Sequence, residues 1–360
     1  MKTNIVCFTG NSGLTDYSVS LCKALGEKAR LITSTQIEPR FTQMGFEVQT
    51  LFRRSRHYPL DILKFMGFAL RHRHEHYIFQ GPLKFPLVDG LVLRLLRLFG
   101  VRATVTVHDV LPHYPNALSK FTFAFYYKSF NQYIAHSERA STALQAMGLR
   151  QPKLVVPHGV YDLFKLSAPS RAEARSRLGL PDEGLKLVLF FGHVETRKGA
   201  LAFAQLAKRF GPHERVKFLI AGKSSLSPAE EQSLADSAKE AGNLEFHNQR
   251  IPFEAVENYF AAADVVALPY LEGTTSGVLK LALAFARPVL ATDVGDFKEQ
   301  IGQKYGLCVP MNENMLDALE QGLRSLLLEQ ARWEASCRAE TADMQWPHIA
   351  KRVSTFVGGE

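Results

Sequence analysis

The most constraining feature of this sequence is an alternation of short apolar segments with longer helix-like segments along the whole chain. Strands that are buried on both faces form continuous apolar runs, and such runs alternating with helices are typical of parallel sheets covered on both sides. The first series contains predicted strands at Asn4–Phe8, Ala29–Thr33, Glu47–Leu51, Tyr77–Gln80, Ala103–Val107, Gln132–Ala135 and Lys153–Val156. The second contains predicted strands at Lys186–Phe191, Val216–Ala221, Leu244–Phe246, Asp264–Leu268, Pro288–Ala291 and Leu307–Val309. The two series predict two doubly wound α/β domains.

A loop-like stretch from Pro157 to Pro169 separates the two series. We therefore predict a first domain over residues 1–165 and a second over residues 166–339. The last residues, 340–360, have a helical pattern. A kink near Pro347 would return this helix to the first domain.

The composition is that of an ordinary globular protein. Of the 360 residues, 46% are hydrophobic and 22% are charged, which excludes a chain that is mainly disordered. The four cysteines are widely scattered and form no C-x-x-C pair. This spacing argues against a disulfide scaffold or a zinc knuckle and fits a reducing compartment.

Neither an export signal nor a membrane span is predicted. The first ten residues contain one lysine and a β-like run that is too short for the apolar core of a signal peptide. The longest apolar stretch, Phe85–Val101, is interrupted by Asp89, Arg94 and Arg97 and does not reach the roughly 20 residues that a spanning helix needs. We expect a cytoplasmic protein that is soluble or bound peripherally at the inner face of a membrane.

Two common types of catalytic site find no support in the sequence. The 12 histidines show no H-E-x-x-H or other metal-ligand spacing, so we expect no metal site. No Gly-x-Ser-x-Gly motif is present, which weakens a hydrolase interpretation.

Positive charge is concentrated in the first half of the chain. Residues 1–165 hold 21 Lys and Arg against 10 Asp and Glu, a net charge of +11, and the remainder carries −3. The basic residues cluster at Arg53, Arg54, Arg56, Arg71 and Arg73. Solvated helix faces, nucleic-acid contact, and attraction to anionic lipid or to a pyrophosphate-bearing acceptor are the alternatives. Because no nucleic-acid-binding motif accompanies the charge, we expect no nucleic-acid partner and favour the third alternative.

Glycine-containing loops after predicted strands are candidate phosphate sites, because doubly wound sheets bind ligands at the carboxyl ends of strands. The first is Gly10-Asn11-Ser12-Gly13, where the amides of the next helix would face an anion, although a simple tight turn explains it equally well. The second runs from Gly192 to Gly199. It contains His193, and it places Lys198 near a helix start, where a cation and free amides would hold a diphosphate. The alternative is an exposed lysine that the helix dipole mildly disfavours.

A third such loop follows the predicted strand Asp264–Leu268. It contains Glu272, Thr275, Ser276 and Gly277 and leads into an apolar helix. Thr275 or Ser276 is a candidate N-cap, and capping without any ligand is the alternative interpretation. Two anion-type loops in one domain favour a diphosphate ligand.

These segments resemble family 4 glycosyltransferases with the GT-B fold. The run Ala262–Tyr270, the segment Ser276-Gly277-Val278-Leu279 and the run Arg287–Gly295 resemble the donor half of that family. The loop Gly192–Gly199 resembles its phosphate-binding loop, and Val156–Tyr161 resembles its inter-domain segment. Two further segments, Val107-His108-Asp109 and Ala135-His136-Ser137-Glu138, resemble strand ends of its acceptor domain.

The resemblance implies two Rossmann-like domains facing a central cleft, with the acceptor side in residues 1–165 and the nucleotide-sugar donor side in residues 166–339. It implies transfer of a sugar from a nucleoside-diphosphate donor to a hydroxyl group, without a metal or other cofactor. The implied catalytic residues are His108, Asp109 and Lys198. The implied donor-binding residues are Gly13, His193, Lys198, Glu272, Thr275, Ser276 and Gly277.

The roles of His108 and Asp109 stay open. They would orient the acceptor or stabilise the donor sugar, and Asp109 would serve as the base if the enzyme inverts. A polar pair that only caps a loop at the strand end is the alternative.

The sequence departs from the family pattern in two places. The family's Glu-x7-Glu pair falls on Gly273 and Leu281 in one register, and on Glu272 and Lys280 in the other. The phosphate-loop arginine is replaced by His193. These departures indicate a bacterial envelope-polysaccharide branch with a Ser-Gly-Val loop. They also leave open a non-catalytic nucleotide-sugar-binding subunit and a GT-B sugar-nucleotide epimerase.

The resemblance to envelope enzymes and the basic first domain together predict a lipid-linked carbohydrate acceptor at an anionic membrane surface. The arginine clusters would hold the domain at the bilayer. Shallow apolar insertion would come from Leu91, Leu93, Leu95, Leu96, Leu98 and Phe99, several of which must face the core instead.

Overall fold

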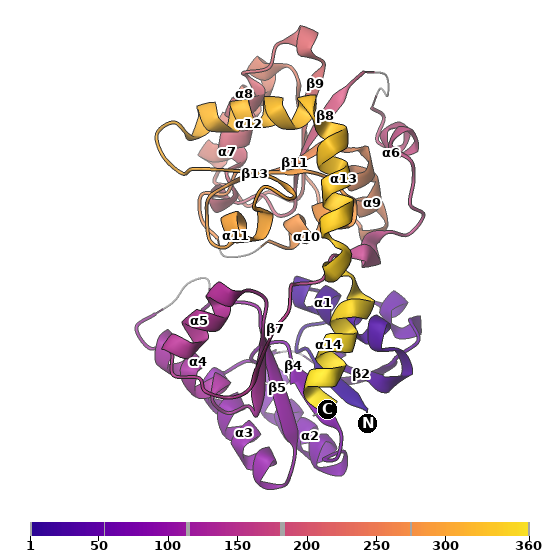
Figure 1. Cartoon of the computed structure of the whole chain (residues 1–360), viewed down its shortest axis with the longest axis vertical. Coiled ribbons are helices and arrows are strands. Elements are labelled where there is room, and N and C mark those ends of the chain that lie inside the picture. Colours follow the sequence, from indigo (N-terminus) through magenta and orange to yellow (C-terminus); the bar gives the residue numbers. More distant parts are fainter. Residues whose placement is uncertain (1, 54, 113–115, 181–183, 274–275, 359–360) are drawn as a thin grey trace. The chain divides into compact units, whose positions relative to one another are not determined.

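The computed structural model describes residues 2–53, 55–112, 116–180, 184–273 and 276–358. The chain forms two compact units. Unit 1 comprises Met1–Gly159 and Asp343–Glu360, and unit 2 comprises Val160–Ala342 (Figure 1). Residues 160–165, which the sequence assigned to the first domain, therefore lie in unit 2.

Unit 1 is built on a parallel sheet of seven strands in the order β3-β2-β1-β4-β5-β6-β7. The strands are β1 (Thr3–Val6), β2 (Ala29–Ser34), β3 (Glu47–Phe52), β4 (His76–Phe79), β5 (Arg102–Val107), β6 (Gln132–Ala135) and β7 (Lys153–Val155). The chain first runs outward from β1 to β3 and then returns to β4 on the other side of β1. The strand order therefore reverses between β1 and β4, which is where ligands of such sheets bind.

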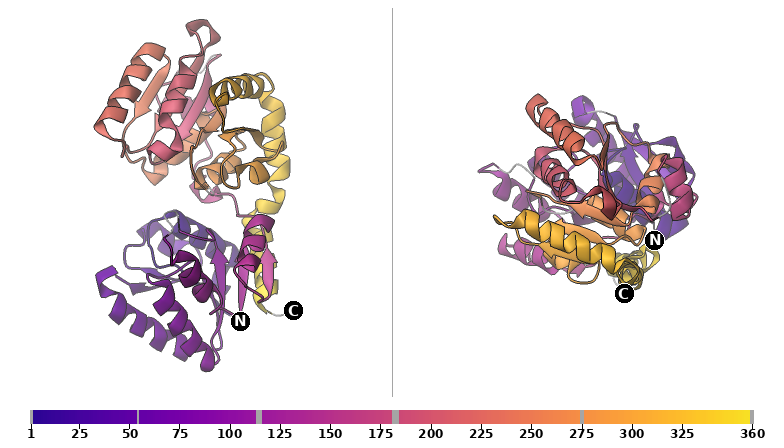
Figure 2. Two further views of the ribbon diagram at one scale, coloured as in Figure 1. Left: turned by 90° about the vertical axis from the view of Figure 1, so that its left-hand side faces the viewer. Right: turned by 90° about the horizontal axis from the view of Figure 1, so that it is seen from above.

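The helices of unit 1 cover both faces of this sheet (Figure 2). They are α1 (Gly13–Leu25), α2 (Tyr58–Arg71), α3 (Pro86–Leu98), α4 (Ser119–Tyr127), α5 (Glu138–Ala146) and α14 (Trp346–Gly358). Because crossovers between parallel strands are right-handed, α2, α3, α4 and α5 lie on one face and α1 lies on the other. α14 packs against α1.

The C-terminal helix α14 is held in unit 1 by contacts at its first residue and at its middle. Trp346 packs so closely on Gly159 that an added Cβ there would lie 2.5 Å from the indole ring. Arg352 Nη2 donates to the carbonyl oxygen of Val155 at 2.8 Å. Pro347 occupies the second position of the helix, where its missing N–H leaves no helical hydrogen bond unmade.

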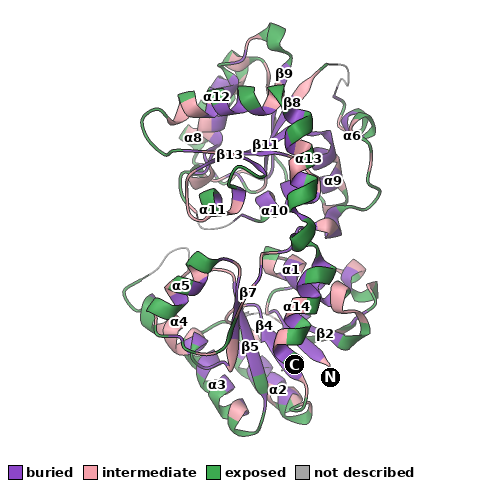
Figure 3. Cartoon of the chain, in the orientation of Figure 1, coloured by how far each residue is buried: buried purple, intermediate pink, exposed green. Residues whose placement is uncertain are grey.

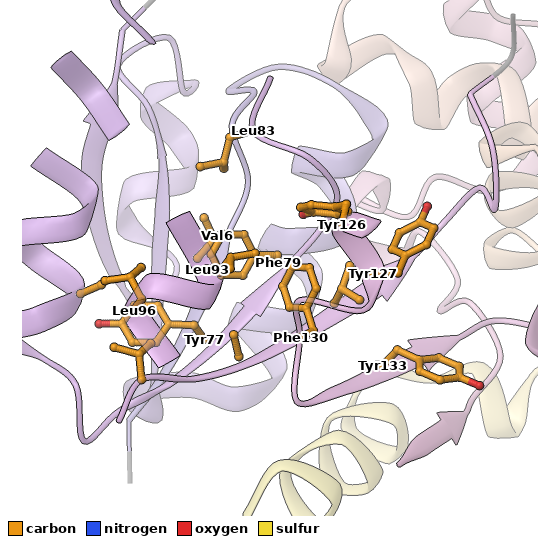
Figure 4. Packing of buried hydrophobic residues seen from close by; sticks show 14 of the residues in the cluster. Val6, Tyr77, Phe79, Leu83, Leu93, Leu96, Tyr126, Tyr127, Phe130 and Tyr133 are labelled. Atoms are coloured by element: carbon orange, nitrogen blue, oxygen red, sulfur yellow. The ribbon is translucent and has the colours of Figure 1, made fainter. Parts of the chain in front are cut away.

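The core of unit 1 lies between the sheet and helices α2, α3 and α4 (Figure 4). In α2, Tyr58, Ile62, Phe65 and Ala69 are buried, and their spacing of four, three and four residues gives one apolar face. The Phe65 and Phe79 rings meet edge to face at 5.6 Å. Aromatic pairs of this kind contribute roughly 1 kcal/mol beyond their buried area.

Unit 2 repeats the plan with a parallel sheet of six strands in the order β10-β9-β8-β11-β12-β13. The strands are β8 (Lys186–Phe191), β9 (Val216–Ala221), β10 (Leu244–His247), β11 (Val265–Leu268), β12 (Val289–Thr292) and β13 (Gly306–Val309). The helices are α6 (Arg171–Arg177), α7 (Ala200–Ala207), α8 (Pro228–Ala241), α9 (Phe253–Ala262), α10 (Gly277–Ala284), α11 (Phe297–Ile301), α12 (Met315–Leu328) and α13 (Gln330–Glu340). Every strand that the sequence predicted is confirmed, and the predicted ends differ from the observed ones by at most two residues.

Short 3-10 turns complete the two units. They are η1 (Gly26–Lys28), η2 (Pro39–Gln43), η3 (Ser55–His57), η4 (Asp162–Phe164), η5 (Thr196–Lys198), η6 (Pro212–Glu214) and η7 (Ala342–Met344).

Candidate functional site

Unit 2 brings three loops together at the carboxyl end of its sheet. Glycines occupy the positions where the backbones of these loops come closest to one another. Gly192 follows β8, Gly222 follows β9, and Gly199 precedes α7. A Cβ added to Gly222 would lie 1.8 Å from the carbonyl oxygen of Gly192, and one added to Gly199 would lie 1.8 Å from that of Pro269, which follows β11. The φ angles of Gly222 and Gly199 are 156° and 72°. Side chains at these positions would force the loops apart, so the glycines fix the floor of the candidate site.

Lys198 places an ammonium group over this floor. Its Nζ lies 3.7 Å from the point where a Cβ of Gly192 would stand, and Val278 of α10 approaches the same point to 3.5 Å. Burial lowers the pKa of Lys198, while the charge of Glu195 raises it. The ammonium makes no hydrogen bond or ion pair to any residue that the structure describes. A partly buried cation that no carboxylate contacts directly favours an anionic ligand.

The charged neighbours of Lys198 are engaged with one another. Arg197 Nε lies 2.6 Å from a Glu195 carboxylate oxygen, and His193 Nε2 lies 3.9 Å from the other oxygen. The carbonyl oxygen of Arg197 accepts hydrogen bonds from the amides of Leu271 at 2.7 Å and Glu272 at 3.2 Å. These bonds pin the loop after β11 to η5. The side chains of His193 and Glu272 are exposed at the surface of this loop pair.

The start of α10 is not capped by the side chain of its N-cap residue. Ser276 stands at the N-cap with extended backbone angles, but its hydroxyl accepts no hydrogen bond from the first turn. The hydroxyl lies instead 3.2 Å from Tyr270 Oη. Gly277, the first helical residue, is exposed, and a Cβ added there would lie 3.3 Å from the Tyr161 ring. A helix start of this kind, with its positive dipole end, suits a phosphate group. Thr275 lies outside the described residues.

Lys280 adds a second, more deeply buried cation to α10. Its side chain is 4% exposed, and burial lowers its pKa from 10.5 to about 8, although the charge of Asp296 raises it in part. Lys280 shares a helix face with Ser276 and Gly277, and helical side chains lean toward the N-terminus. The charged group within reach of its ammonium is Asp296, directly before α11.

The loop before α1 in unit 1 makes hydrogen bonds with the first turn of that helix. Ser12 caps α1 by accepting from the amide of Thr15 at 3.4 Å, and Thr15 Oγ1 accepts from the amide of Ser12 at 3.2 Å. A Cβ added to Gly10 would lie 2.6 Å from the amide nitrogen of Ile37. Gly10 is thus needed for close packing within unit 1, and Gly13 is the first residue of the capped helix.

His108 and Asp109 directly follow β5. His108 Nε2 lies 3.0 Å from Gln80 Oε1, and Gln80 directly follows the neighbouring strand β4. Burial lowers the pKa of His108 well below its usual value, and proximity to His136 lowers it further. The ring is therefore a neutral imidazole at physiological pH. The carbonyl oxygen of Asp109 accepts a hydrogen bond from Tyr127 Oη at 2.9 Å, which fixes the backbone of this strand end.

His108 belongs to an aromatic cluster that the sequence analysis did not anticipate. The ring of Tyr17 in α1 packs against those of His108 at 4.6 Å, His136 at 5.3 Å, His158 at 5.0 Å and Trp346 at 5.0 Å. The sequence held one signal for it, because the three histidines follow the consecutive strands β5, β6 and β7. A site role for Lys280 was also not predicted from the sequence. The available signal was a single lysine inside an otherwise apolar helix.

The structure thus gathers Lys198, Ser276 and Gly277 in unit 2, with His193 and Glu272 on the adjoining loops. Gly13 lies in unit 1 as the first residue of α1, and His108 and Asp109 lie in the same unit directly after β5. Within the described part of the chain, no three His, Cys, Asp or Glu side chains are grouped so that they could hold a metal ion.

Comparison with known proteins agrees with this geometry. Residues 185–328, which contain Lys198 and α10, match the sequence model of the family Glycosyl transferases group 1. The chain is 30% identical over 197 residues to a D-inositol 3-phosphate glycosyltransferase of Kineococcus radiotolerans, an alignment that covers 50% of this chain and 44% of the relative. It is 31% identical over 232 residues to the protein of the same name from Nocardia farcinica, covering 60% and 49%. The chain therefore aligns with slightly less than half of the length of these relatives.

Solved structures match the chain over its full length. HepE of Anabaena in complex with UDP superposes with a TM-score of 0.77 at 15% identity and covers 100% of both chains. WaaG, a glycosyltransferase involved in lipopolysaccharide biosynthesis, superposes with a TM-score of 0.71 at 16% identity, covering 99% of this chain and 100% of WaaG. The predicted fold class is confirmed: the chain has two Rossmann-like α/β units and the GT-B fold.

Proposed function

We propose that this protein is a glycosyltransferase that moves a sugar from a nucleoside-diphosphate donor to a carbohydrate acceptor. The observation that carries the proposal is the unpartnered ammonium of Lys198, held between Gly192 and the start of α10. An ammonium and an open helix start together suit a diphosphate. The family match over the same residues, and the UDP bound in the similar fold of HepE, support this choice of ligand.

In this proposal the leaving diphosphate is stabilised by residues of the chain. Glycosyl transfer breaks the bond between the sugar and the diphosphate, and negative charge develops on the departing oxygen. A preorganised cation and helix amides aimed at that oxygen lower the barrier, because they need no reorganisation as the charge appears. Lys198 and the first turn of α10 would supply this stabilisation without a metal or other cofactor. His193, Glu272 and Thr275 would complete the donor site.

The acceptor side is proposed for unit 1. His108 is a neutral imidazole whose Nε2–H donates to Gln80 Oε1, so its Nδ1 is left to accept one hydrogen bond. Asp109 follows it and would act as the base if the reaction inverts. The acceptor that we propose is a lipid-linked sugar of envelope polysaccharide synthesis at the cytoplasmic face of the membrane. The basic charge of the first half of the chain supports an anionic, membrane-bound acceptor.

A second candidate is a nucleotide-sugar-binding subunit without turnover. One observation favours it: neither register of the family's Glu-x7-Glu pair provides two carboxylates, and Leu281, which is buried, cannot bond a ribose hydroxyl. A donor panel separates the two candidates. Purified protein is mixed with nucleotide sugars, with and without lipid-linked acceptors, and free nucleoside diphosphate is assayed. Release that depends on the acceptor supports transfer, whereas binding without release supports the subunit. An isomerised donor would instead indicate an epimerase.

A further inference from the structure

Unit 1 has one face on which apolar side chains are left in solvent. Among the described residues, sixteen large apolar side chains are exposed, and twelve of them lie on or beside α2, α3 and α4. Soluble proteins seldom leave an apolar patch of this extent without a partner. These twelve residues, here called the apolar face, are Leu60, Leu63, Leu70, Phe85, Leu87, Val88, Leu91, Leu95, Leu98, Phe99, Leu118 and Phe121.

The helix α3 shows the feature most clearly. Its inner side buries Leu93 and Leu96 in the core of unit 1. Its outer side carries Leu87, Val88, Leu91, Leu95 and Leu98, at helical spacings of one, three, four and three residues. Leu91 is 60% exposed and Leu98 is 83% exposed. A helix that is apolar on both sides is expected in a protein core or against lipid, and the outer residues of α3 are exposed (Figure 3).

The neighbouring helices extend this surface. α2 and α4 lie on the same face of the sheet as α3 and pack against it. Leu60, Leu63 and Leu70 follow the outer side of α2, and Leu118 and Phe121 stand at the start of α4. The stripe along α2 repeats at three and seven residues, which is one helix face.

The charges around the apolar face have one sign. Lys64 and Arg71 on α2, Arg73 just after it, and Lys120 on α4 are exposed. Acidic groups are withdrawn from the same surface. Asp61 and Asp89 are buried, and Glu75 is ion-paired with Arg30 at 2.6 Å. Residues 56–108 contain no other carboxylate, and residues 116–131 contain none.

We propose that the apolar face of α2, α3 and α4 docks onto an anionic lipid bilayer, with its leucines inserted below the headgroups and its lysines and arginines at the headgroup level. Apolar side chains rimmed by cations, without exposed carboxylates, match the chemistry of such a surface. A protein partner or a second copy of the chain would not require this exclusion of negative charge. The inference deepens the membrane part of the proposed function, and it does not depend on glycosyl transfer.

This surface shares Arg71 and Arg73 with the arginine clusters that the sequence suggested, but it does not include Arg53. Arg53 donates to the buried Asp61 through its side chain at 2.8 Å and through its amide at 2.9 Å. Burial raises the pKa of Asp61, but these bonds outweigh it, so that the pKa is lowered. Arg53 is therefore held by unit 1 itself, and Arg54 lies outside the described residues. Arg56, Arg71 and Arg73 are exposed.

The experiment is co-sedimentation of the full chain with vesicles, without donor or acceptor. The double variant Leu91→Glu/Leu98→Glu changes two exposed positions of α3, and Leu328→Glu changes an exposed leucine of α12 in unit 2. We expect wild type and Leu328→Glu to bind vesicles of 30% anionic lipid at low salt. The double variant should bind at least tenfold more weakly. Salt should weaken all binding by screening the charges.

Insertion is tested directly with a fluorescent reporter. Leu98→Trp should be quenched by brominated anionic lipids, and Leu328→Trp should not. The two native tryptophans are buried and provide a constant background. Circular dichroism and nucleotide titration calorimetry on the double variant establish that it is folded and that its donor site is unchanged.

Three results would overturn the proposal. They are absence of wild-type binding to anionic vesicles at low salt, equal binding by wild type and the double variant, and a concentration-dependent dimer that the double variant abolishes. The last result would assign the apolar face to a second copy of the chain. Failure of the donor panel with intact vesicle binding would instead contradict the proposed transferase function alone.

Discussion

The starts of α1 and α10 look alike in sequence and differ in structure. Each follows a buried strand by a loop that contains serine and glycine, and each helix begins with a glycine after a serine at the N-cap. In α1 the serine caps the helix together with Thr15, and the loop is packed against residues 36–37. In α10 the serine turns to Tyr270, and Lys198 approaches the first turn. The same residue types thus cap one helix start and leave the amides of the other uncapped by a side chain. The difference arises from the neighbouring residues, Thr15 at α1 and Tyr270 and Lys198 at α10.

The prediction with the largest expected effect removes the Lys198 ammonium group near the start of α10. We expect Lys198→Ala to lose at least about 100-fold in kcat/KM, equivalent to about 2.7 kcal/mol of transition-state stabilisation. Initial rates of nucleoside-diphosphate release measure the effect. The matched control is Lys239→Ala, an exposed lysine on α8. Near wild-type turnover in Lys198→Ala, with the fold unchanged, would remove Lys198 from the donor site.

The second test narrows the approach to the helix amides. Gly277→Val places a branched side chain at the first residue of α10, where even a Cβ would lie 3.3 Å from Tyr161. We expect nucleotide affinity to fall about 30-fold, roughly 2 kcal/mol, because the phosphate can no longer reach the backbone. Acceptor binding should be unchanged.

Isothermal titration calorimetry with the nucleoside diphosphate measures this affinity. Gly67→Val in α2 is the matched control, since a side chain there meets no atom within 4 Å. Equal nucleotide affinity in Gly277→Val and wild type would show that the ligand does not use this helix start.

The third test concerns Lys280, whose pKa is lowered to about 8 by burial. In the unfolded chain its pKa returns to 10.5, so the unfolded state binds more protons between these two values and stability rises with pH. Wild type should gain about 1 kcal/mol of unfolding free energy between about pH 7.5 and 9 relative to Lys280→Met. If the Lys280 ammonium also binds the nucleotide, Lys280→Met should weaken nucleotide binding about tenfold.

Urea unfolding at the two pH values and calorimetry at pH 7.5 provide these measurements. A variant that is more stable than wild type at pH 7.5, with unchanged nucleotide affinity, would make Lys280 a tolerated core lysine. Parallel pH profiles for the two proteins would contradict the lowered pKa itself.

The fold could be predicted because its signals are local. Most strands contain a short apolar run, and β6, β8 and β9 have the same ends in the sequence prediction and in the structure. The site was less accessible, because it depends on contacts between distant segments. That Gly222 and Gly199 fit against the carbonyl oxygens of Gly192 and Pro269 follows only from the packing of three loops. Nothing local distinguishes Ser12, which caps, from Ser276, which does not.

The prediction with the smallest expected effect compares Ser12 with Ser276. Ser12→Ala removes an N-cap hydrogen bond and should destabilise the first turn of α1 by about 1 kcal/mol. Ser276→Ala removes no cap. It removes the hydrogen bond to Tyr270 Oη, which involves none of the first-turn amides of α10, so the protection of these amides should change little. Amide hydrogen exchange is the appropriate measurement, since it reports on each helix start separately. The first-turn amides of α1 should exchange about fivefold faster in Ser12→Ala, whereas those of α10 should change little in Ser276→Ala.

Addition of nucleoside diphosphate should then slow exchange at α10 in both variants and leave α1 of Ser12→Ala less affected. If Ser276→Ala accelerated exchange at α10 as strongly as Ser12→Ala does at α1, both serines would be caps, and the structural difference between the two helix starts would be contradicted.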